Sequence, residues 1–457
     1  MTVAVGDEPV VGLEGFGGLV LKPGDAGYEE ERRVHNGLID KRPALIAQAR
    51  GVADVVAAVN LARERGLELS IRGGGHNVSG KAVTEGGLML DLSLMKGIHV
   101  DPAARTVRAQ GGVLWGELNR ETQLHGLAVT GGVISSTGIA GLTLGAGLGW
   151  LLPSQGFAAD NLVSVQLVTA DGSVLTASES EHEDLFWAVR GGGGNFGVAT
   201  SFEYRLRPVG PLVTGGMIIH PFDAARDVWR GFGELTADLP DELMTVAGLV
   251  HAPDGSGMKV CGILVCHVGS PEQAERDLAP ILGLGEPIAT EVGPIPYSVM
   301  NTLLDEAYPK GSLNYWKSSF MRTVPDEAID IAVEAFARSP SPMSGMILEH
   351  FHGAVTRVPV TATACPHRDE GYNFLATSVW TDPADTEANV AWTRELFEAL
   401  EPFFTGRRWL NYLGEDDMAS ASLDAAYGPN QERLAQIKAA YDPTNLFRLN
   451  LNVEPAA

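Results

Sequence analysis

The chain has 457 residues, of which 45% are hydrophobic, and it contains 55 glycines and 26 prolines. This length indicates two or three domains, and the composition is that of a globular protein rich in turns. The formal net charge of -24 argues against a nucleic-acid partner, because an acidic surface repels phosphate backbones. No apolar run is as long as a membrane span, so no segment is expected to cross a bilayer.

The N-terminus and the cysteines bear on the cellular compartment. Residues 1–18 lack a basic segment followed by a long apolar one, so no signal peptide is predicted. The three cysteines, Cys261, Cys266 and Cys365, form no C-x-x-C pair, and H-E-x-x-H is absent. We therefore expect a cytoplasmic protein with no disulfide framework and no bound metal.

Residues 30–210 are predicted to form one α+β unit. Residues 52–65 carry apolar residues at helical spacing and stop at Gly66, which indicates an amphipathic helix. A short strand follows at 67–72 and enters a glycine loop. Further strands and hairpins are predicted at 87–95, 97–112 and 161–178, and helices at 116–126 and 181–191.

Residues 211–410 differ in pattern, because long alternating strands are separated by helical stretches. The predicted strands lie in "GGMIIHPF", "MKVCGILVCHV", "SGMILEHFHGAV" and "NFLATSVWT". The predicted helices lie in "SPEQAERDLAPIL", "PDEAIDIAVEAFARS" and "TEANVAWTRELFEAL". An antiparallel sheet covered by helices is the natural interpretation of a second domain. Residues 432–455 read as a helix, a turn and an apolar tail.

The first glycine-rich stretch is "IRGGGHNVSG", residues 71–80. Its strand ends at Arg72, and the following glycine amides can surround a pyrophosphate while the arginine adds positive charge. His76 is either a hydrogen-bonding loop residue or a nucleophile toward a cofactor. A metal-ligand role is not supported, because no partner ligands are visible.

The second stretch, residues 130–150, crowds glycines around a Ser-Ser-Thr run. So much glycine lets backbone N–H groups approach a bulky ligand closely, and the hydroxyls can bind a phosphate or a ring. A packed helical turn would explain the glycines but not the hydroxyl run.

The third stretch, residues 190–206, contains a formal G-x-G-x-x-G at Gly192, Gly194 and Gly197. A dinucleotide fingerprint must follow a strand and open a helix, whereas here a helix precedes and a strand follows. The nicotinamide type of site is therefore excluded. A glycine turn without any ligand explains this stretch equally well.

Together these motifs resemble one family. "RGGGHNVSG", "TGIAGLTLGAGLGWL", "DLFWAVRGGGGNFGV", "NYLG" and "YDPTNLFRLN" occur in family order over about residues 35–457. They make the chain similar to FAD-linked oxidases of the vanillyl-alcohol-oxidase superfamily, in its bacterial berberine-bridge-enzyme-like branch. The resemblance implies an α+β, two-domain PCMH-type FAD-binding fold with an antiparallel-sheet substrate domain covered by helices. It assigns 1–210 to the FAD domain, 211–410 to the substrate domain, and 411–457 to a C-terminal segment that returns to the FAD domain.

The resemblance also implies the cofactor and its contacts. His76 matches the histidine that is bonded covalently to the 8α carbon of FAD. Many relatives carry a second link through a cysteine, but that position is Ile134 here, so one bond through His76 is expected. The other positions that match the family's cofactor-binding motifs are Arg72, Gly73, Gly74, Gly75, Asn77, Gly80, Thr137, Gly138, Gly141, Thr143, Asn195, Gly197, Val198 and Asn450.

The catalytic base is sought first near the C-terminus. Hydride transfer from carbon to flavin N5 requires a base for the proton on oxygen or nitrogen. Asn411 and Tyr412 match an N-Y-x-D motif of the family in which Gly414 replaces the acid. Tyr412 is the first candidate, and its pKa, ordinarily near 10, would have to be lowered by a cation such as Lys317.

Glu349 and His352 are the other candidates for the base. Strand alternation puts Glu349 on one face and His352 on the other, and the sequence does not say which face meets the flavin. Lys317 and Glu349 could equally form a solvated or interdomain ion pair. Tyr315 and Trp316 either line the substrate pocket or belong to the core, and the case for Tyr308 is weaker still. His367 and Arg368 are predicted to be structural, with Arg368 paired to an acid.

The expected function is that of an FAD-dependent oxidase. It would take hydride from a small alcohol, amine or secondary metabolite and pass electrons to O2, giving H2O2, and the small Thr137 is compatible with oxygen access. The expected partners are this substrate and O2, in a monomer or homodimer. The alternatives are a dehydrogenase with another acceptor, an oxygenating or cyclising flavoenzyme, and a flavin-binding protein without turnover. The fold does not choose the substrate.

Overall fold

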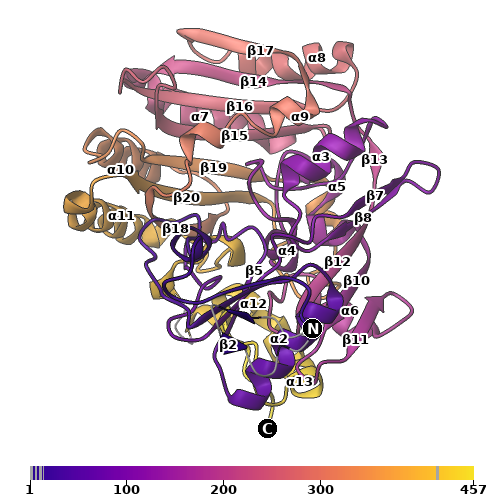
Figure 1. Ribbon diagram of the computed structural model, residues 1–457. Coiled ribbons are helices and arrows are strands. Elements are labelled where there is room, and N and C mark those ends of the chain that lie inside the picture. The colour runs from indigo at the N-terminus through magenta and orange to yellow at the C-terminus, as the bar shows by residue number, and fades with distance from the viewer. Residues whose placement is uncertain (1–3, 6–7, 10–12, 14, 418–420) are drawn as a thin grey trace.

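The structure is a computed structural model that describes residues 4–5, 8–9, 13, 15–417 and 421–457. Half of residues 1–18, the stretch used to predict the absence of a signal peptide, therefore lies outside the described residues. Figure 1 shows a broad sheet at the top, smaller sheets below and to the right, and the C-terminal segment among the latter. Two short strand pairs lie apart from these sheets: β1 (Ala4–Val5) with β2 (Glu8–Pro9), and β9 (Leu127–Ala128) with β13 (Arg207–Pro208).

The N-terminal residues 19–91 contain a four-stranded sheet with the order β3-β4-β6-β5. Its strands are β3 (Leu19–Leu21), β4 (Leu45–Gln48), β5 (Leu69–Arg72) and β6 (Leu88–Asp91), and the last two are parallel. Helix α2 (Val52–Arg65) joins β4 to β5 and buries its apolar face in the core beneath the sheet. The helix has the predicted bounds, and Gly66 ends it with a φ of 61°.

A five-stranded antiparallel sheet follows, with the order β11-β10-β12-β8-β7. Its strands are β7 (Ile98–Asp101), β8 (Thr106–Gln110), β10 (Leu162–Val168), β11 (Val174–Ser178) and β12 (Val198–Arg205). Around it lie α3 (Trp115–Gln123), α4 (Ile139–Leu144) and α6 (Glu183–Val189). The short helix α5 (Leu152–Gln155) packs instead against residues 353–357. The C-terminal helices α12 (Ala421–Tyr427) and α13 (Gln431–Tyr441) share its hydrophobic core, so both ends of the chain build this part.

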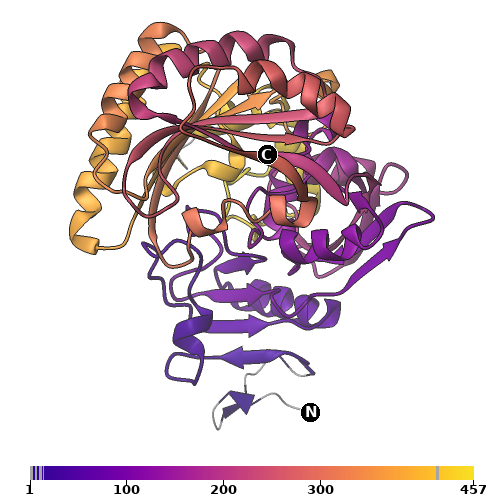
Figure 2. The ribbon, with the colours of Figure 1, turned by 90° about the horizontal axis from the view of Figure 1, so that it is seen from above.

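The broad sheet has seven antiparallel strands in the order β17-β14-β16-β15-β19-β20-β18. Helices α7 (Ala225–Leu235), α8 (Pro271–Leu282), α10 (Asp326–Ala337) and α11 (Thr386–Leu400) cover its outer face, as Figure 2 shows. The inner face turns toward the smaller sheets. The strands are β14 (Leu212–Pro221), β15 (Leu243–His251), β16 (Lys259–His267), β17 (Ala289–Pro296), β18 (Leu313–Met321), β19 (Gly345–Phe351) and β20 (Gly371–Trp380).

Two negative findings concern the described residues. None of their helices is long and apolar enough to cross a membrane. Within the same residues, no group of three or more His, Cys, Asp or Glu side chains is arranged to hold a metal ion.

Candidate active site

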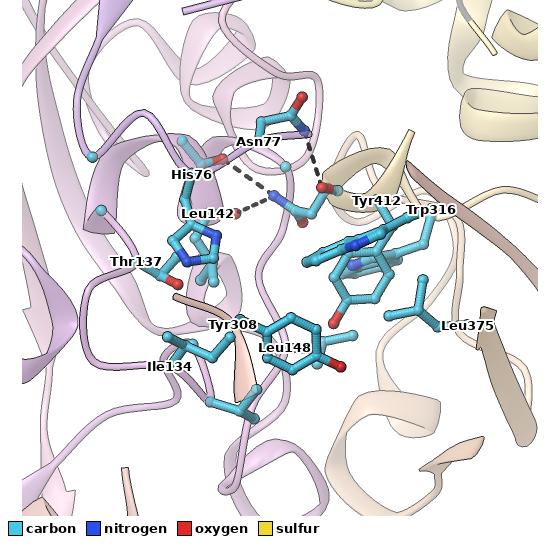
Figure 3. A pocket seen from close by; sticks show the side chains of 18 of the residues that line it. His76, Asn77, Ile134, Thr137, Leu142, Leu148, Tyr308, Trp316, Leu375 and Tyr412 are labelled. Carbon is cyan, nitrogen blue, oxygen red and sulfur yellow. Dashed lines mark hydrogen bonds between the residues drawn. The ribbon is translucent and has the colours of Figure 1, made fainter. Parts of the chain in front are cut away.

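A cavity of about 780 Å³ lies between the glycine loops and the inner face of the seven-stranded sheet. Figure 3 shows His76 and Thr137 on one side, with Trp316, Leu375 and Tyr412 across from them. The three glycine-rich stretches all contribute lining residues, as do residues 409–412, 447 and 449–451. The fold therefore brings together segments from both ends of the chain and from the broad sheet.

The first glycine loop leaves β5 and enters the cavity wall with Gly73, Gly74 and Gly75. A Cβ atom on Gly74 would lie 2.4 Å from the backbone N of Gly138. The first and second loops therefore touch through their backbones, which only glycine permits. Gly80 does not line the cavity. It has a φ of +67°, and its backbone packs against Ile39.

Arg72 departs from the expected contact with a pyrophosphate. Its guanidinium lies outside the cavity lining and forms a bidentate pair with Asp91, with Nε 2.9 Å from Oδ1. A second carboxylate, that of Glu31, lies 2.7 Å from Nη2. The physical reason is strand register, because Asp91 stands opposite Arg72 on the parallel neighbour β6. Arg72 thus fixes the start of the loop through contacts that lie outside the cavity.

His76 lines the cavity and stacks on His35, with ring centroids 3.9 Å apart. Burial, and secondarily the neighbouring His35, lower the pKa of His76 to about 3. The ring is therefore neutral at physiological pH and carries a free nitrogen lone pair. Its Nε2 is buried without a hydrogen-bond partner in the described part of the chain. Sequence reasoning missed His35, because nothing near it in sequence marks a ligand.

The second loop contributes Ile134, Thr137, Gly138 and Gly141 to the lining. The side chain of Ile134, the residue that the resemblance aligns with the second linking position of relatives, reaches the cavity (Figure 3). Thr143 departs from its expected role. It is fully buried outside the lining, and its hydroxyl lies 2.9 Å from that of Tyr204.

The third loop lines the cavity with Gly193, Gly194 and Gly197. Two residues of this loop that were predicted to bind the cofactor, Asn195 and Val198, do not line the cavity. The Asn195 amide donates to the carbonyls of Gly192 and Leu451, and its oxygen accepts from a C-terminal N–H, so this side chain pins the tail. Val198 is buried in the core beneath the four-stranded sheet. Asn450, from the tail itself, lines the cavity over Gly194.

Glu349 and Tyr412 form a hydrogen-bonded pair in the cavity lining. The Tyr412 hydroxyl donates to Glu349 Oε1 over 2.8 Å, and the Asn373 amide donates to Oε2 over 2.7 Å. Burial raises the pKa of Glu349 to about 7. Burial also raises the pKa of Tyr412 well above 10, and the Glu349 charge adds to this effect. The carboxyl group, not the phenol, can therefore gain and lose a proton near neutral pH.

Asn411 links the C-terminal segment to the glycine loops. Its Nδ2 donates to the carbonyls of Gly141 and Leu142, at 3.3 and 3.2 Å. Its own carbonyl accepts from Asn77 Nδ2 at 3.0 Å (Figure 3). Asn411 and Asn77 both line the cavity, so these bonds fix the position of Tyr412 relative to His76.

Lys317, Tyr315 and His352 lie outside the cavity lining, so the structure gives no support to the catalytic roles predicted for them. Tyr315 and Lys317 alternate with Trp316 along β18, so Trp316 points inward and they point to the opposite face. His352 directly follows β19, and strand alternation directs its side chain to the face opposite that of Glu349.

Their partners show what these side chains do instead. Lys317 Nζ lies 3.0 Å from Asp416 and 2.7 Å from Asp417, so its charge is paired with these two carboxylates. It is not among the groups that shift the pKa of Tyr412. Asp417 also accepts from the N–H of Gly414, the residue that replaces the family's acid. The Tyr315 hydroxyl donates to Asp416. The His352 ring stacks on His350. Arg368 pairs with Asp160, as predicted for a structural residue.

Known proteins share this architecture and its motifs. Residues 43–178 match a family model described as FAD binding domain, and residues 411–454 match one described as berberine and berberine like. The chain is 34% identical to (R)-6-hydroxynicotine oxidase of Paenarthrobacter nicotinovorans, with 96% of this chain and 97% of the relative covered. This chain belongs to the berberine-bridge-enzyme-like family of FAD-linked oxidoreductases.

Two further relatives support the family. An FAD-linked oxidoreductase of Dictyostelium discoideum is 30% identical, with 97% of this chain and 96% of that protein covered. The crystal structure of 6-hydroxy-D-nicotine oxidase from Arthrobacter nicotinovorans has a TM-score of 0.90 at 30% identity, with 98% and 100% covered. The predicted α+β, PCMH-type FAD-binding fold is thereby confirmed, and the chain is an FAD-dependent oxidoreductase.

The residues of this berberine-bridge-like site fit FAD. The contact between Gly74 and Gly138 leaves backbone groups, and no side chains, at the junction of two loops on the cavity wall. His76 Nε2 and Asn411 Oδ1 are buried polar atoms with no partner among the described residues. Each would be costly to leave unpaired, which indicates a polar ligand in this part of the cavity.

Asn373, which donates to the Glu349 carboxylate, is a candidate site residue that sequence reasoning missed. It opens the predicted strand "NFLATSVWT", and in β20 it stands directly opposite Glu349 on β19. A polar amide directly before the apolar run Phe374–Ala376 was the available signal. Trp316 and Tyr308, which the sequence left open between pocket and core, both line the cavity.

Proposed function

We propose that the chain is an FAD-dependent oxidase with its flavin attached covalently through His76. It would oxidise a small alcohol, amine or secondary metabolite and use O2 as acceptor, giving H2O2. The observation that carries this proposal is the buried Glu349–Tyr412 pair across the cavity from His76. Residues 1–210 with 411–457 would hold the cofactor, and 211–410 would hold the substrate.

FAD, when bound, accepts a hydride equivalent from a carbon atom of the substrate. The chain's own contribution is proton transfer and orientation. Glu349, with a pKa of about 7, takes the proton from the substrate's hydroxyl or amine. Tyr412 and Asn373 hold one carboxylate oxygen each and so fix the direction of the remaining lone pairs. Asn411 anchors this arrangement to the glycine loops.

The experiment that tests this function is anaerobic mixing of the enzyme with a panel of alcohols and amines, followed by admission of air. Bleaching of the flavin by a panel member, and equimolar H2O2 on reoxidation, would support the oxidase. Bleaching without peroxide in air would favour a dehydrogenase. Labelled oxygen in the product would favour oxygenating chemistry, and no bleaching by any member would count against turnover of these classes.

His76→Ala is expected to abolish acid-stable flavin binding. The support is a neutral, buried imidazole with an unpaired nitrogen, which is a competent nucleophile, and an isoleucine where a second link would need a cysteine. The measurement is the absorbance of protein precipitated with acid and redissolved. His99→Ala, at an exposed position on β7, is the control and should stay yellow. A yellow His76→Ala pellet would mean that another residue holds the flavin.

A further inference from the structure

The inner face of the broad sheet meets the cavity in successive rows of paired residues. In the first row, Met217 pairs with Leu264, Leu264 with Val246, and Val246 with Glu349. All four line the cavity. The proposed base thus stands at one end of a line of apolar side chains.

The second row lies two residues further along the strands and contains two paired glycines. Gly262 pairs with Gly248, Gly248 with Ile347, and Ile347 with Leu375, and all four line the cavity. Because strands rise about 3.4 Å per residue, this row lies about 7 Å from the first. Two neighbouring glycines leave a depression in the sheet, which we call the glycine trough.

The fold does not require glycine at these two positions. Neither has a positive φ. A Cβ on Gly248 would lie 3.3 Å from Ile347 Cγ2 and from the Met346 carbonyl oxygen, and one on Gly262 would lie 3.3 Å from Met217 Sδ. These contacts are tight, but small shifts of the neighbouring atoms would accommodate them. By contrast, a Cβ on Gly112 would lie 1.8 Å from a carbonyl oxygen. Glycine also weakens a strand interior, so its place here is explained by the space it opens for a ligand.

The trough continues to the surface. Val250 and Gly345 come next on β15 and β19 and also line the cavity. Beyond them the lining ends at Pro253 and Pro342, both exposed. The trough therefore runs from the row that holds Glu349 toward solvent.

The walls around the trough are apolar and aromatic. Among the described strand residues of the broad sheet that line the cavity, only Glu349 and His251 carry ionisable groups. His251 lies at the outer end, with Nδ1 3.2 Å from the Ser344 carbonyl oxygen. Near Glu349, the Trp316 ring lies 5.5 Å from that of Tyr308 and 6.0 Å from that of Tyr412. Aromatic edges and faces of this kind pack well against a planar ring.

We infer that the substrate is an elongated aromatic alcohol or amine, with its reacting group at Glu349 and its remaining body in the glycine trough. This inference rests on the proposed function, because it takes Glu349 as the group that receives the substrate's proton. A saccharide fits poorly, because its many hydroxyls would lose hydrogen bonds to water against Leu264, Val246 and Ile347.

Binding to the holoenzyme can be followed as a change in the flavin absorption spectrum. The probes are phenol, 4-phenylphenol and cellobiose, which compare one ring with two, and two aromatic rings with two sugar rings. We expect 4-phenylphenol to bind about tenfold or more tightly than either of the others. Gly248→Leu should fill the trough, weakening 4-phenylphenol about tenfold or more while changing phenol by less than about twofold.

Gly293→Leu is the matched control, since Gly293 lies in the edge strand β17, outside the cavity lining and with open space around it. It should leave all three affinities unchanged. If Gly248→Leu fails to fold, Gly248→Ala and Gly262→Ala provide the same comparison with a smaller fall for 4-phenylphenol.

Two results would overturn the inference: equal weakening of phenol and 4-phenylphenol in the trough variants, or cellobiose binding more tightly than 4-phenylphenol to the unaltered enzyme. Failure of the proposed function would look different. In that case the preference for two aromatic rings would persist, while no alcohol or amine would bleach the flavin.

Discussion

Glu349→Gln is expected to slow flavin reduction by any substrate of the wild-type enzyme about 10²- to 10⁴-fold. Glutamine keeps the size of the side chain and can still accept from the Tyr412 hydroxyl, but it cannot take a proton. The Glu349 carboxyl group is the titratable group on the catalytic side whose pKa, at about 7, suits a base at neutral pH. Anaerobic stopped-flow absorbance of the flavin measures this rate directly.

The rate of flavin reduction is also expected to depend on pH, and the raised pKa of Glu349 sets the direction of that dependence. Burial raises the pKa of Glu349 to about 7, so the carboxylate is mostly protonated below that pH and mostly ionised above it. The wild-type rate should therefore rise through a midpoint near pH 7, and the glutamine variant should lose this rise. Glu334→Gln, on the exposed side of α10, is the control and should keep the wild-type profile. An unchanged profile in Glu349→Gln would place the base elsewhere.

Glycine positions were the part of the site most accessible from sequence. Gly73, Gly74, Gly138, Gly141 and Gly197 all reach the cavity. The reason is that contact between backbones, as between Gly74 and Gly138, leaves no room for a side chain. Such positions require glycine, and the glycine can be recognised in the sequence.

The destinations of long polar side chains were much less predictable. Arg72, Lys317 and Thr143 all carry chemistry suited to a cofactor or a base, yet each is held by a partner outside the cavity. Those partners lie 19, 100 and 61 positions away in the sequence. These partners meet only in the folded chain, so the local sequence pattern around each residue does not indicate its partner.

The broad sheet was recognised from sequence, but not all of its strands. β14, β16, β19 and β20 fall in predicted strands, whereas β15, β17 and β18 were not singled out. β17 is a largely accessible edge strand. β15 and β18 are buried almost throughout, because helices cover one face and the cavity wall or the C-terminal segment covers the other. A strand buried on both faces shows little alternation between apolar and polar residues, which removes the usual signal.

Arg72 separates the two interpretations of the first glycine loop most sharply. If its guanidinium contacted the pyrophosphate, its loss would weaken FAD binding and leave the folding of the chain alone. In the structure it instead neutralises Asp91, whose side chain is 0% exposed. The Arg72 side chain itself is 8% exposed, so the pair is screened very little by solvent.

Arg72→Ala is therefore expected to lower the free energy of unfolding by about 3–5 kcal/mol, because it leaves the Asp91 carboxylate buried and unpaired. Denaturant unfolding of the FAD-free protein measures this loss, in a His76→Ala background that forms no covalent bond to the flavin. Arg108→Ala removes a largely exposed partner of Glu203 and should cost no more than about 1 kcal/mol. Adding Asp91→Ala to Arg72→Ala should recover part of the stability, because the unpaired charge is then gone. If Arg72→Ala leaves the free energy of unfolding unchanged but weakens FAD binding, the contact between Arg72 and the pyrophosphate would be supported instead.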